Sequence, residues 1–185
     1  MEKTITNCYF DNAATSWPKP EEVYTAAEKF MRHGGANPGR SGHTRALRAD
    51  RLVYETRERA ASFLGAKRPE EIIFTLNATD SLNMAIKGVL EPGDHVIYTS
   101  MEHNSILRPL GALRQAKVIT TTMISCDSAG QLDPADIEKA VLPETKLIIS
   151  TNASNVTGGI LPVKEVGQIA REKGILFLVD AAQTA

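Results

Sequence analysis

The chain has 185 residues, enough for one large domain or most of one, and a chain of this size buries roughly 70% of its unfolded surface. Lys and Arg total 21 and Asp and Glu total 22, so the formal net charge is −1. This balance argues against a nucleic-acid or anionic-membrane partner, because both favour a basic face. Aromatic residues make up 5% of the chain, too few for a base-stacking surface.

The two cysteines, Cys8 and Cys126, lie in no paired spacing such as C-x-x-C. The sequence therefore predicts neither a metal site nor a disulfide framework. We interpret both residues as reduced thiols in a cytoplasmic protein. The N-terminus has no apolar segment typical of a signal peptide, and no apolar run approaches membrane-spanning length.

Hydrophobic periodicity predicts an alternation of helices and strands along most of the chain. Helices are expected at residues 20–33, 49–64, 82–90, 105–116, 133–141 and 163–173. Strands are expected at residues 5–10, 72–75, 95–100, 117–124, 146–151 and 175–180. Strands that alternate with helices imply a parallel sheet with right-handed crossovers. The predicted fold is a three-layer α/β domain at residues 16–185, preceded by an N-terminal arm at residues 1–15.

Proline and glycine mark several of these boundaries. Pro20 suits the first turn of a helix that should stop before Gly34, and Pro109 is expected in the first turn of its own helix. The glycine-rich stretch at residues 34–42 predicts a loop. Its segment 39–43 could bind an anion, although it matches neither G-x-G-x-x-G nor a P-loop.

Polar residues follow four of the predicted strands. In parallel sheets, ligands bind beyond the carboxyl ends of the strands, so these residues are expected on one rim. They are Thr79 at a helix start, His103 in Met101–Asn104, Asn155 in the loop 152–159, and Asp180 with Gln183. Each has a simpler interpretation. Thr79 and Asp180 could be capping residues, His103 a surface or capping residue, and Asn155 part of a tight turn.

One ligand class would use the whole set. A phosphorylated heteroaromatic ring needs an anion-binding helix start, a flat partner for its face, a carboxylate for its ring nitrogen and an amide for its phenolic oxygen. Pyridoxal 5′-phosphate is such a ligand, and its ring acts as an electron sink when it is paired with a carboxylate. The sequence therefore predicts a site for this cofactor.

The sequence resembles the class V aminotransferase group of pyridoxal-phosphate enzymes (fold type I), and within it the cysteine desulfurases and selenocysteine lyases. The similarity runs through essentially the whole chain. The most specific matches are Phe74-Thr-Leu-Asn-Ala-Thr79, Met101-Glu-His-Asn104, Ser154-Asn-Val-Thr-Gly158 and Val179-Asp-Ala-Ala-Gln183.

The resemblance implies a role for each rim residue. Ala78 and Thr79 would hold the phosphate. His103 would stack on the pyridine ring and handle protons during catalysis. Asn155 and Gln183 would bind the phenolic side of the ring, and Asp180 would pair with the pyridinium nitrogen. The implied reaction takes sulfur from L-cysteine and leaves L-alanine and an enzyme persulfide, in a homodimer that passes sulfur to an acceptor protein.

Several family residues have no match in this chain. The Schiff-base lysine of a Ser/Gly-His-Lys motif, the late sulfur-accepting cysteine, the substrate-binding arginine and the small domain would all follow Ala185. Gly39 stands where many relatives have a histidine before Arg40. The chain is therefore expected to be the N-terminal part of the large domain, inactive by itself.

Three alternatives remain open at this stage. The chain could be a non-catalytic cofactor-binding fragment that needs a partner chain, or part of another class V lyase or aminotransferase. A nucleotide-binding dehydrogenase domain is less favoured, because the glycine fingerprint after the first strand is missing.

Overall fold

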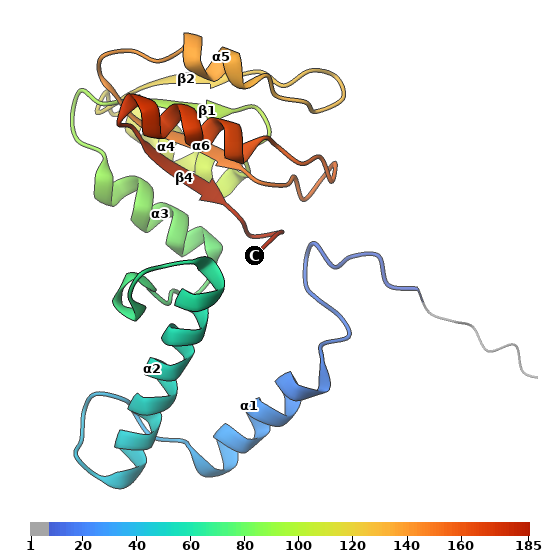
Figure 1. The fold of residues 1–185 in the computed structure, drawn as a ribbon, viewed down its shortest axis with the longest axis vertical. Helices are drawn as coiled ribbons and strands as arrows, with labels where there is room; N and C mark the ends of the chain where they lie inside the picture. The colour runs from blue at the N-terminus through green and yellow to red at the C-terminus, as the bar shows by residue number, and fades with distance from the viewer. Residues whose placement is uncertain (1–7) are drawn as a thin grey trace, which may run out of the picture. The chain divides into compact units, whose positions relative to one another are not determined.

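The computed structural model describes residues 8–185, which divide into two compact units: one extends to Phe74, and the other is Thr75–Ala185. The elements are labelled in Figure 1. The helices are α1 (Glu21–His33), α2 (Thr44–Leu64), a 3₁₀ turn (Pro69–Glu71), α3 (Ala78–Val89), α4 (Asn104–Gln115), α5 (Pro134–Lys139) and α6 (Val163–Lys173). The strands are β1 (His95–Thr99), β2 (Thr120–Ile124), β3 (Thr145–Thr151) and β4 (Leu176–Asp180).

The first unit contains α1 and α2. Helix α1 begins after Pro20 and ends before Gly34, as predicted. Helix α2 begins at Thr44, earlier than the predicted residue 49, because the His43 side chain caps it by accepting a hydrogen bond from the Ala46 N–H at 3.2 Å. It ends at Gly65, whose φ of 71° is left-handed and favours glycine.

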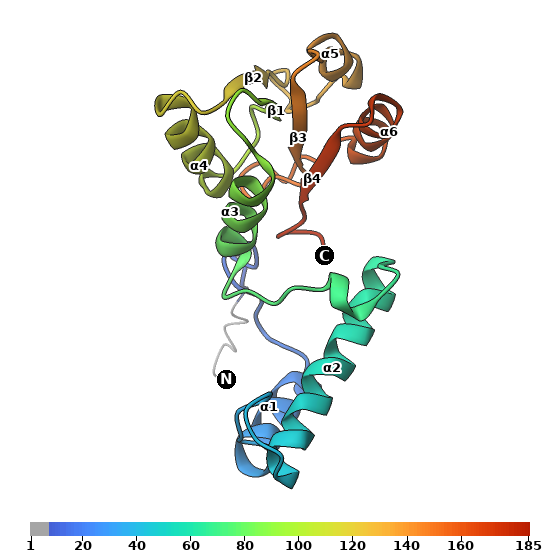
Figure 2. The same cartoon turned by 90° about the vertical axis from the view of Figure 1, so that its left-hand side faces the viewer.

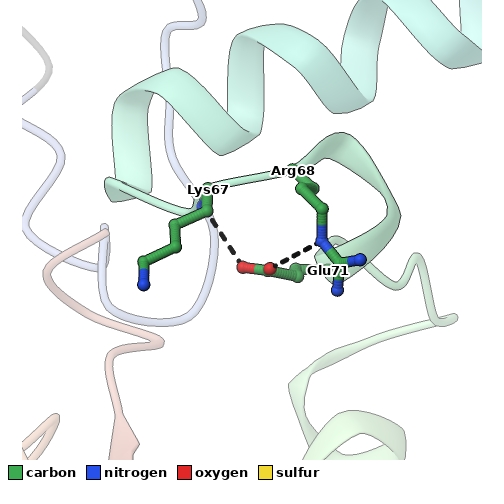
Figure 3. A network of polar contacts seen from close by, with 3 residues as sticks. All are labelled: Lys67, Arg68 and Glu71. Atoms are coloured by element: carbon green, nitrogen blue, oxygen red, sulfur yellow. Dashed lines mark hydrogen bonds and ion pairs between the residues drawn. The ribbon is translucent and has the colours of Figure 1, made fainter.

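Glu71 organises the turn that follows α2. One of its carboxylate oxygens accepts a hydrogen bond from the Lys67 backbone N–H, and the other accepts one from the Arg68 Nε, both at 3.2 Å (Figure 3). The next residues, 72–75, are not in a strand, so that prediction was wrong. Ile73 is 63% exposed. The run has the β-branched residues of a strand, but among the described residues it pairs with no neighbour.

Half of the strand predicted at residues 5–10 lies outside the described residues, and the described half, residues 8–10, forms no strand.

The second unit is built on a four-stranded sheet in the order β2-β1-β3-β4, and all three pairs are parallel. Helices α3 and α4 cover one face, while α5 and α6 cover the other (Figure 2). This arrangement confirms the predicted α/β fold with three layers. It also brings the carboxyl ends of β1, β3 and β4, three neighbouring strands, to the same edge of the sheet.

Alternation along the strands divides the core into two apolar clusters. Val96, Leu147 and Ile149 face α3 and α4, whereas Ile97 and Ile148 face α5 and α6. All five side chains are at most 2% exposed. Full burial of an aliphatic side chain contributes about 1.5–3 kcal/mol, so the two clusters supply much of the stability of this unit.

Pro109 is inside α4 rather than in its first turn, which corrects the prediction. A proline has no N–H to donate, so the carbonyl of Ser105, four residues earlier, has no partner at position 109. Asn83 on α3 takes that role, because its Nδ2 donates to the Ser105 carbonyl oxygen at 3.4 Å. The same Nδ2 donates to the Thr79 carbonyl oxygen at 3.0 Å. The proline is therefore accommodated by a bond between two helices.

His95 is a buried polar residue at the start of β1, only 1% exposed. Its Nδ1 lies 2.8 Å from the Thr145 hydroxyl on β3, and its Nε2 lies 2.8 Å from the Thr122 hydroxyl on β2. Burial lowers the pKa of His95 below its ordinary 6.5, although Glu144 acts in the opposite direction. The neutral ring thus joins three strands at the end of the sheet opposite to the rim described below.

Candidate functional site

Helix α3 presents its N-terminus close to the sheet rim. Its N-cap is Asn77, whose Oδ1 accepts a hydrogen bond from the Asp80 N–H at 2.9 Å. The capping interpretation of Thr79 is therefore wrong. Ala78 and Thr79 are both exposed in the first turn, where backbone N–H groups have no acceptor inside the helix. These groups, together with the positive end of the helix dipole, suit an anion.

His103 immediately precedes α4 and is its N-cap. Its Nδ1 accepts a hydrogen bond from the Ser105 N–H at 3.2 Å and lies 2.8 Å from the Ser105 hydroxyl. The capping interpretation of His103 is thus correct, and it has a chemical consequence. Because Nδ1 is an acceptor, the proton of the neutral ring is on Nε2. The ring is exposed with a fixed tautomer, which is suitable for stacking and for proton transfer at Nε2.

Thr79 and His103 line the same surface cavity, which has a volume of about 570 Å³ between α3 and α4. Asn83, Lys87 and Arg108 also line it. Two basic side chains and a helix N-terminus give this cavity a positive character. Asn155, Asp180 and Gln183 are not among its lining residues.

Asp180 ends β4 and is 8% exposed. Its Oδ1 accepts a hydrogen bond from the Ala182 N–H at 3.0 Å, so it does cap the following turn. Its backbone oxygen accepts a bond from the Asn152 N–H at 2.9 Å, which joins the end of β4 to the loop after β3. A capping role alone does not require burial, because most caps are exposed. A carboxylate in such a place favours a cationic partner.

Gln183 and Asn155 both lie exposed on loops at the carboxyl end of the sheet. Gln183 is in the turn after β4, which is tied to the loop after β3 by a 2.9 Å bond from Asn152 Nδ2 to the Thr184 hydroxyl. Asn155 is in a tight turn, as predicted. The Ser154 hydroxyl organises this turn by accepting bonds from the backbone N–H groups of residues 156 and 157.

Glu102 also lies at this rim, and the sequence did not predict it as a site residue. It lies between β1 and α4 and is 6% exposed. Its Oε1 accepts a hydrogen bond from the Thr99 hydroxyl at 2.6 Å and another from the Thr151 N–H at 2.9 Å. Burial, with a smaller contribution from Asp180, raises the pKa of Glu102. The sequence did contain one signal for it: Glu102 is a charged residue three positions after the buried end of β1.

Among residues 8–185, no group of three His, Cys, Asp or Glu side chains could hold a metal ion. Within the same range, no helix is both long enough and apolar enough to cross a membrane.

The parallel sheet, with helices on both faces and polar residues at its carboxyl end, has clear counterparts among known proteins. The aminotransferase class V family model matches residues 8–185, and the chain belongs to this family. Its relatives include a probable cysteine desulfurase of Methanothermobacter thermautotrophicus. That protein is 37% identical over 177 residues, which cover 95% of this chain and 44% of the relative.

Solved structures support the same family. The apo structure of a cysteine desulfurase from Thermococcus onnurineus NA1 has a TM-score of 0.87 and 37% identity, covering 95% of this chain and 44% of the other. A structure described as SspA in complex with cysteine has a TM-score of 0.88 and 34% identity, covering 95% and 51%. The chain therefore spans about half the length of the proteins it matches.

Proposed function

We propose that this chain is the N-terminal part of the cofactor-binding domain of a pyridoxal 5′-phosphate-dependent cysteine desulfurase. The observation that carries the proposal is the buried carboxylate of Asp180 at the carboxyl end of β4. In open parallel sheets this is the ligand-binding edge. The pyridinium nitrogen would give the buried carboxylate the cationic partner that makes its burial favourable.

The other rim residues fit the remaining parts of the cofactor. The backbone N–H groups of Ala78 and Thr79, with the Thr79 hydroxyl, would hold the phosphate at the start of α3. Asn155 and Gln183, on the loops after β3 and β4, would donate to the phenolic oxygen. When bound, pyridoxal phosphate supplies an electron sink for bond cleavage at the substrate α-carbon.

His103 would contribute both contact and proton transfer. Its exposed ring would stack on the cofactor, and its Nδ1, held by the Ser105 N–H, leaves Nε2 as the position where a proton is carried. Because the capping bond fixes the ring, His103 would keep its orientation while it moves a proton.

L-Cysteine is the substrate that the comparisons support. The relatives described above are named cysteine desulfurases, and one solved neighbour is described as a complex with cysteine. The products would be L-alanine and an enzyme persulfide. The Schiff-base lysine, the persulfide cysteine and the substrate arginine would come from sequence beyond these residues. The whole enzyme would be a cytoplasmic homodimer that delivers sulfur to an acceptor protein.

Cofactor binding can be tested on the 185-residue chain by titrating it with pyridoxal 5′-phosphate and following the cofactor absorbance. Asp180→Asn removes the charge of the ring-nitrogen partner and should weaken binding at least tenfold. Glu165→Gln, an equivalent carboxylate-to-amide change on the exposed side of α6, should leave binding unchanged. Equal affinity for the Asp180→Asn and wild-type chains would argue against the proposed site.

The reaction requires a chain extended to the length of the relatives. Supplied with cofactor, L-cysteine and a thiol reductant that releases the persulfide sulfur as sulfide, it should form alanine and sulfide in equal amounts. Turnover of a different amino acid, with none for cysteine, would show that the substrate assignment is wrong. Borohydride reduction of the 185-residue chain with cofactor should trap no specific lysine adduct. A stoichiometric adduct would mean that a lysine within these residues takes the family role.

A further inference from the structure

Ser105 lies in the first turn of α4 and contacts His103 twice. Its backbone N–H donates to the His103 Nδ1 at 3.2 Å, and its hydroxyl oxygen lies 2.8 Å from the same nitrogen. Among the described residues, these are the two hydrogen-bonding neighbours of Nδ1. Ser105 is only 7% exposed, so the surrounding atoms restrict its side chain. The hydroxyl is therefore a fixed neighbour of the imidazole ring.

The two neighbours of Nδ1 differ in how they respond to protonation of the ring. The backbone N–H can only donate, so it binds Nδ1 only while that nitrogen is unprotonated. A serine hydroxyl has one donor and two acceptor lone pairs, and its hydrogen rotates to suit its partner. The Ser105 hydroxyl can thus donate to an unprotonated Nδ1 and accept a hydrogen bond from a protonated one.

Proton transfer at Nε2 of His103 requires both forms of Nδ1. In the neutral ring that the cap holds, the proton is on Nε2 and Nδ1 is an acceptor. The ring can accept a proton at Nε2 only when that nitrogen has a free lone pair, and the proton of a neutral ring is then on Nδ1. The doubly protonated ring also has a proton on Nδ1. A ring held by the backbone N–H alone would be released in both of these forms.

The charged groups near the ring do not supply an acceptor for a protonated Nδ1. Lys87 on α3 and Arg108 on α4 line the same cavity as His103, and both of these side chains can only donate hydrogen bonds. Glu102 precedes His103 in the chain, but its Oε1 bonds to the ends of β1 and β3. Its Oε2 has no hydrogen-bond partner among the described residues. The Ser105 hydroxyl is therefore the acceptor that the structure offers to Nδ1.

The backbone of Ser105 is also joined to α3. Asn83 Nδ2 donates to the Ser105 carbonyl oxygen at 3.4 Å and to the Thr79 carbonyl oxygen at 3.0 Å. The residue that holds His103 is thereby connected to the first turn of α3. A ring that stays bound to Ser105 consequently keeps its position relative to that turn, where the proposed function places the phosphate.

We propose that Ser105 is a positioning residue for His103: its hydroxyl donates to Nδ1 when that nitrogen is unprotonated and accepts from it when it is protonated. The ring therefore keeps its place while a proton enters or leaves Nε2. The use of this hydrogen bond during catalysis rests on the proposed function. The hydrogen bond itself is a property of the folded chain and does not depend on the cofactor.

NMR spectroscopy of the cofactor-free chain, with labelled histidine rings, tests the hydrogen bond. His103→Asn identifies the His103 signals by removing them, and the ¹⁵N shifts of the ring show when both nitrogens are protonated. The order parameter of the wild-type ring should stay near about 0.85, as in rigid groups, in the neutral and the doubly protonated forms. Ser105→Ala should lower it below about 0.6 in the protonated form. A wild-type ring that becomes mobile on protonation would overturn the proposal.

Two further variants separate the hydroxyl from other effects of substitution. Ser105→Thr keeps a hydroxyl, and there is space for its methyl group because Ser105 lines the cavity between α3 and α4. The His103 ring should then stay ordered in both forms. Ser128→Ala, which removes an exposed hydroxyl in the turn after β2, should match the wild type. An ordered, protonated ring in Ser105→Ala would overturn the proposal, and if that variant fails to fold, the wild-type measurement still decides.

The catalytic consequence can be measured in the extended chain with cofactor and L-cysteine. Positioned proton transfer supplies about 10²–10⁴-fold in rate, so Ser105→Ala should lower the single-turnover rate of alanine formation about tenfold, and Ser105→Thr should restore it. The Kd for pyridoxal 5′-phosphate should change by less than about threefold, because the backbone N–H still holds the neutral ring. An unchanged rate, or a Kd that rises as much as the rate falls, would overturn the positioning role. Absence of any reaction with cysteine in the wild type would instead contradict the proposed function, while the NMR result would still decide the role of the hydroxyl.

Discussion

The two units of the chain differ in how their apolar residues are covered. In Thr75–Ala185, helices pack on both faces of a sheet and enclose two aliphatic clusters. In the first unit, α1 buries no residue, and α2 buries only Ala46, Ala49 and Ala61. Large apolar side chains there are exposed, such as Met31 at 73% and Phe63 at 76%.

This difference shows that a hydrophobic pattern can predict a helix without predicting which surface covers the apolar face of that helix. A stripe of apolar residues at helical spacing predicts the helix: α2 formed over the whole predicted range, although it begins earlier, at Thr44. Helix α1, predicted from Pro20 and Gly34, formed where expected. The same stripe does not specify what covers it. In the second unit, the sheet is the covering surface, and it is made from the same stretch of chain as the helices.

The largest expected effect is in the second unit. Ile148 is fully buried on β3, so Ile148→Ala should destabilise this unit by about 2–5 kcal/mol, from lost burial and the cavity that remains. Urea denaturation followed by circular dichroism would measure this loss. Ile160→Ala is the matched control, because Ile160 is 75% exposed and should change stability by less than about 0.5 kcal/mol. Equal effects at the two positions would contradict the assigned core.

An intermediate effect is expected from pH. Burial lowers the pKa of His95 in the folded chain, so the unfolded chain binds the extra proton. Stability should therefore fall as pH decreases from about 6.5 towards the folded pKa, by up to about 1.4 kcal/mol per pH unit. His95→Gln, which replaces the ring with a neutral polar side chain, should flatten this dependence.

The pH profile of His95→Gln must be compared with that of the wild type, because Glu102 changes stability with pH in the opposite direction to His95. The pKa of Glu102 is raised in the folded chain, so its contribution decreases as pH rises. That contribution is the same in the wild type and in His95→Gln, and the difference between their pH profiles isolates His95. Superimposable profiles would show that the buried ring does not control acid stability.

The smallest effect is expected in the first unit. Phe63 is 76% exposed on α2, so Phe63→Ala should change stability by no more than about 0.5 kcal/mol. Phe177→Ala is the matched variant in the second unit, where the ring packs against a buried cluster and its loss should cost more. Measuring both by denaturant titration would sharpen the contrast. A loss above about 2 kcal/mol at Phe63 would mean that α2 is covered in solution.

The sequence predicted the fold well wherever periodicity was long or caps were strong. Helices α1 and α6 and strands β3 and β4 lie within one residue of their expected ends. The strand expected at residues 72–75 failed because a strand depends on a partner, which local composition does not reveal. The position of Pro109 within its helix was predicted wrongly, because the hydrogen bond that the proline removes from α4 is replaced by one from Asn83 on α3.

The site was predictable only as a set of strand-end residues. Position after a predicted strand selected His103 and Asp180, which do lie at the ends of β1 and β4, whereas the strand predicted before Thr79 did not form. Sequence could not indicate that Asn77 is the cap of α3, nor that Glu102 turns inwards while His103 is exposed. Those outcomes depend on side-chain direction, which is determined by packing and by hydrogen bonds between residues far apart in the chain.

The bond between Asn83 and the Ser105 carbonyl has a consequence for how this part of the chain can evolve. Pro109 creates the unmet acceptor, and Asn83 satisfies it from a different helix. A residue with an N–H at position 109 would satisfy the same carbonyl within α4 and remove that demand on position 83. The two positions should therefore covary: homologues without the proline should tolerate apolar or small residues at position 83, and those with it should keep a donor there.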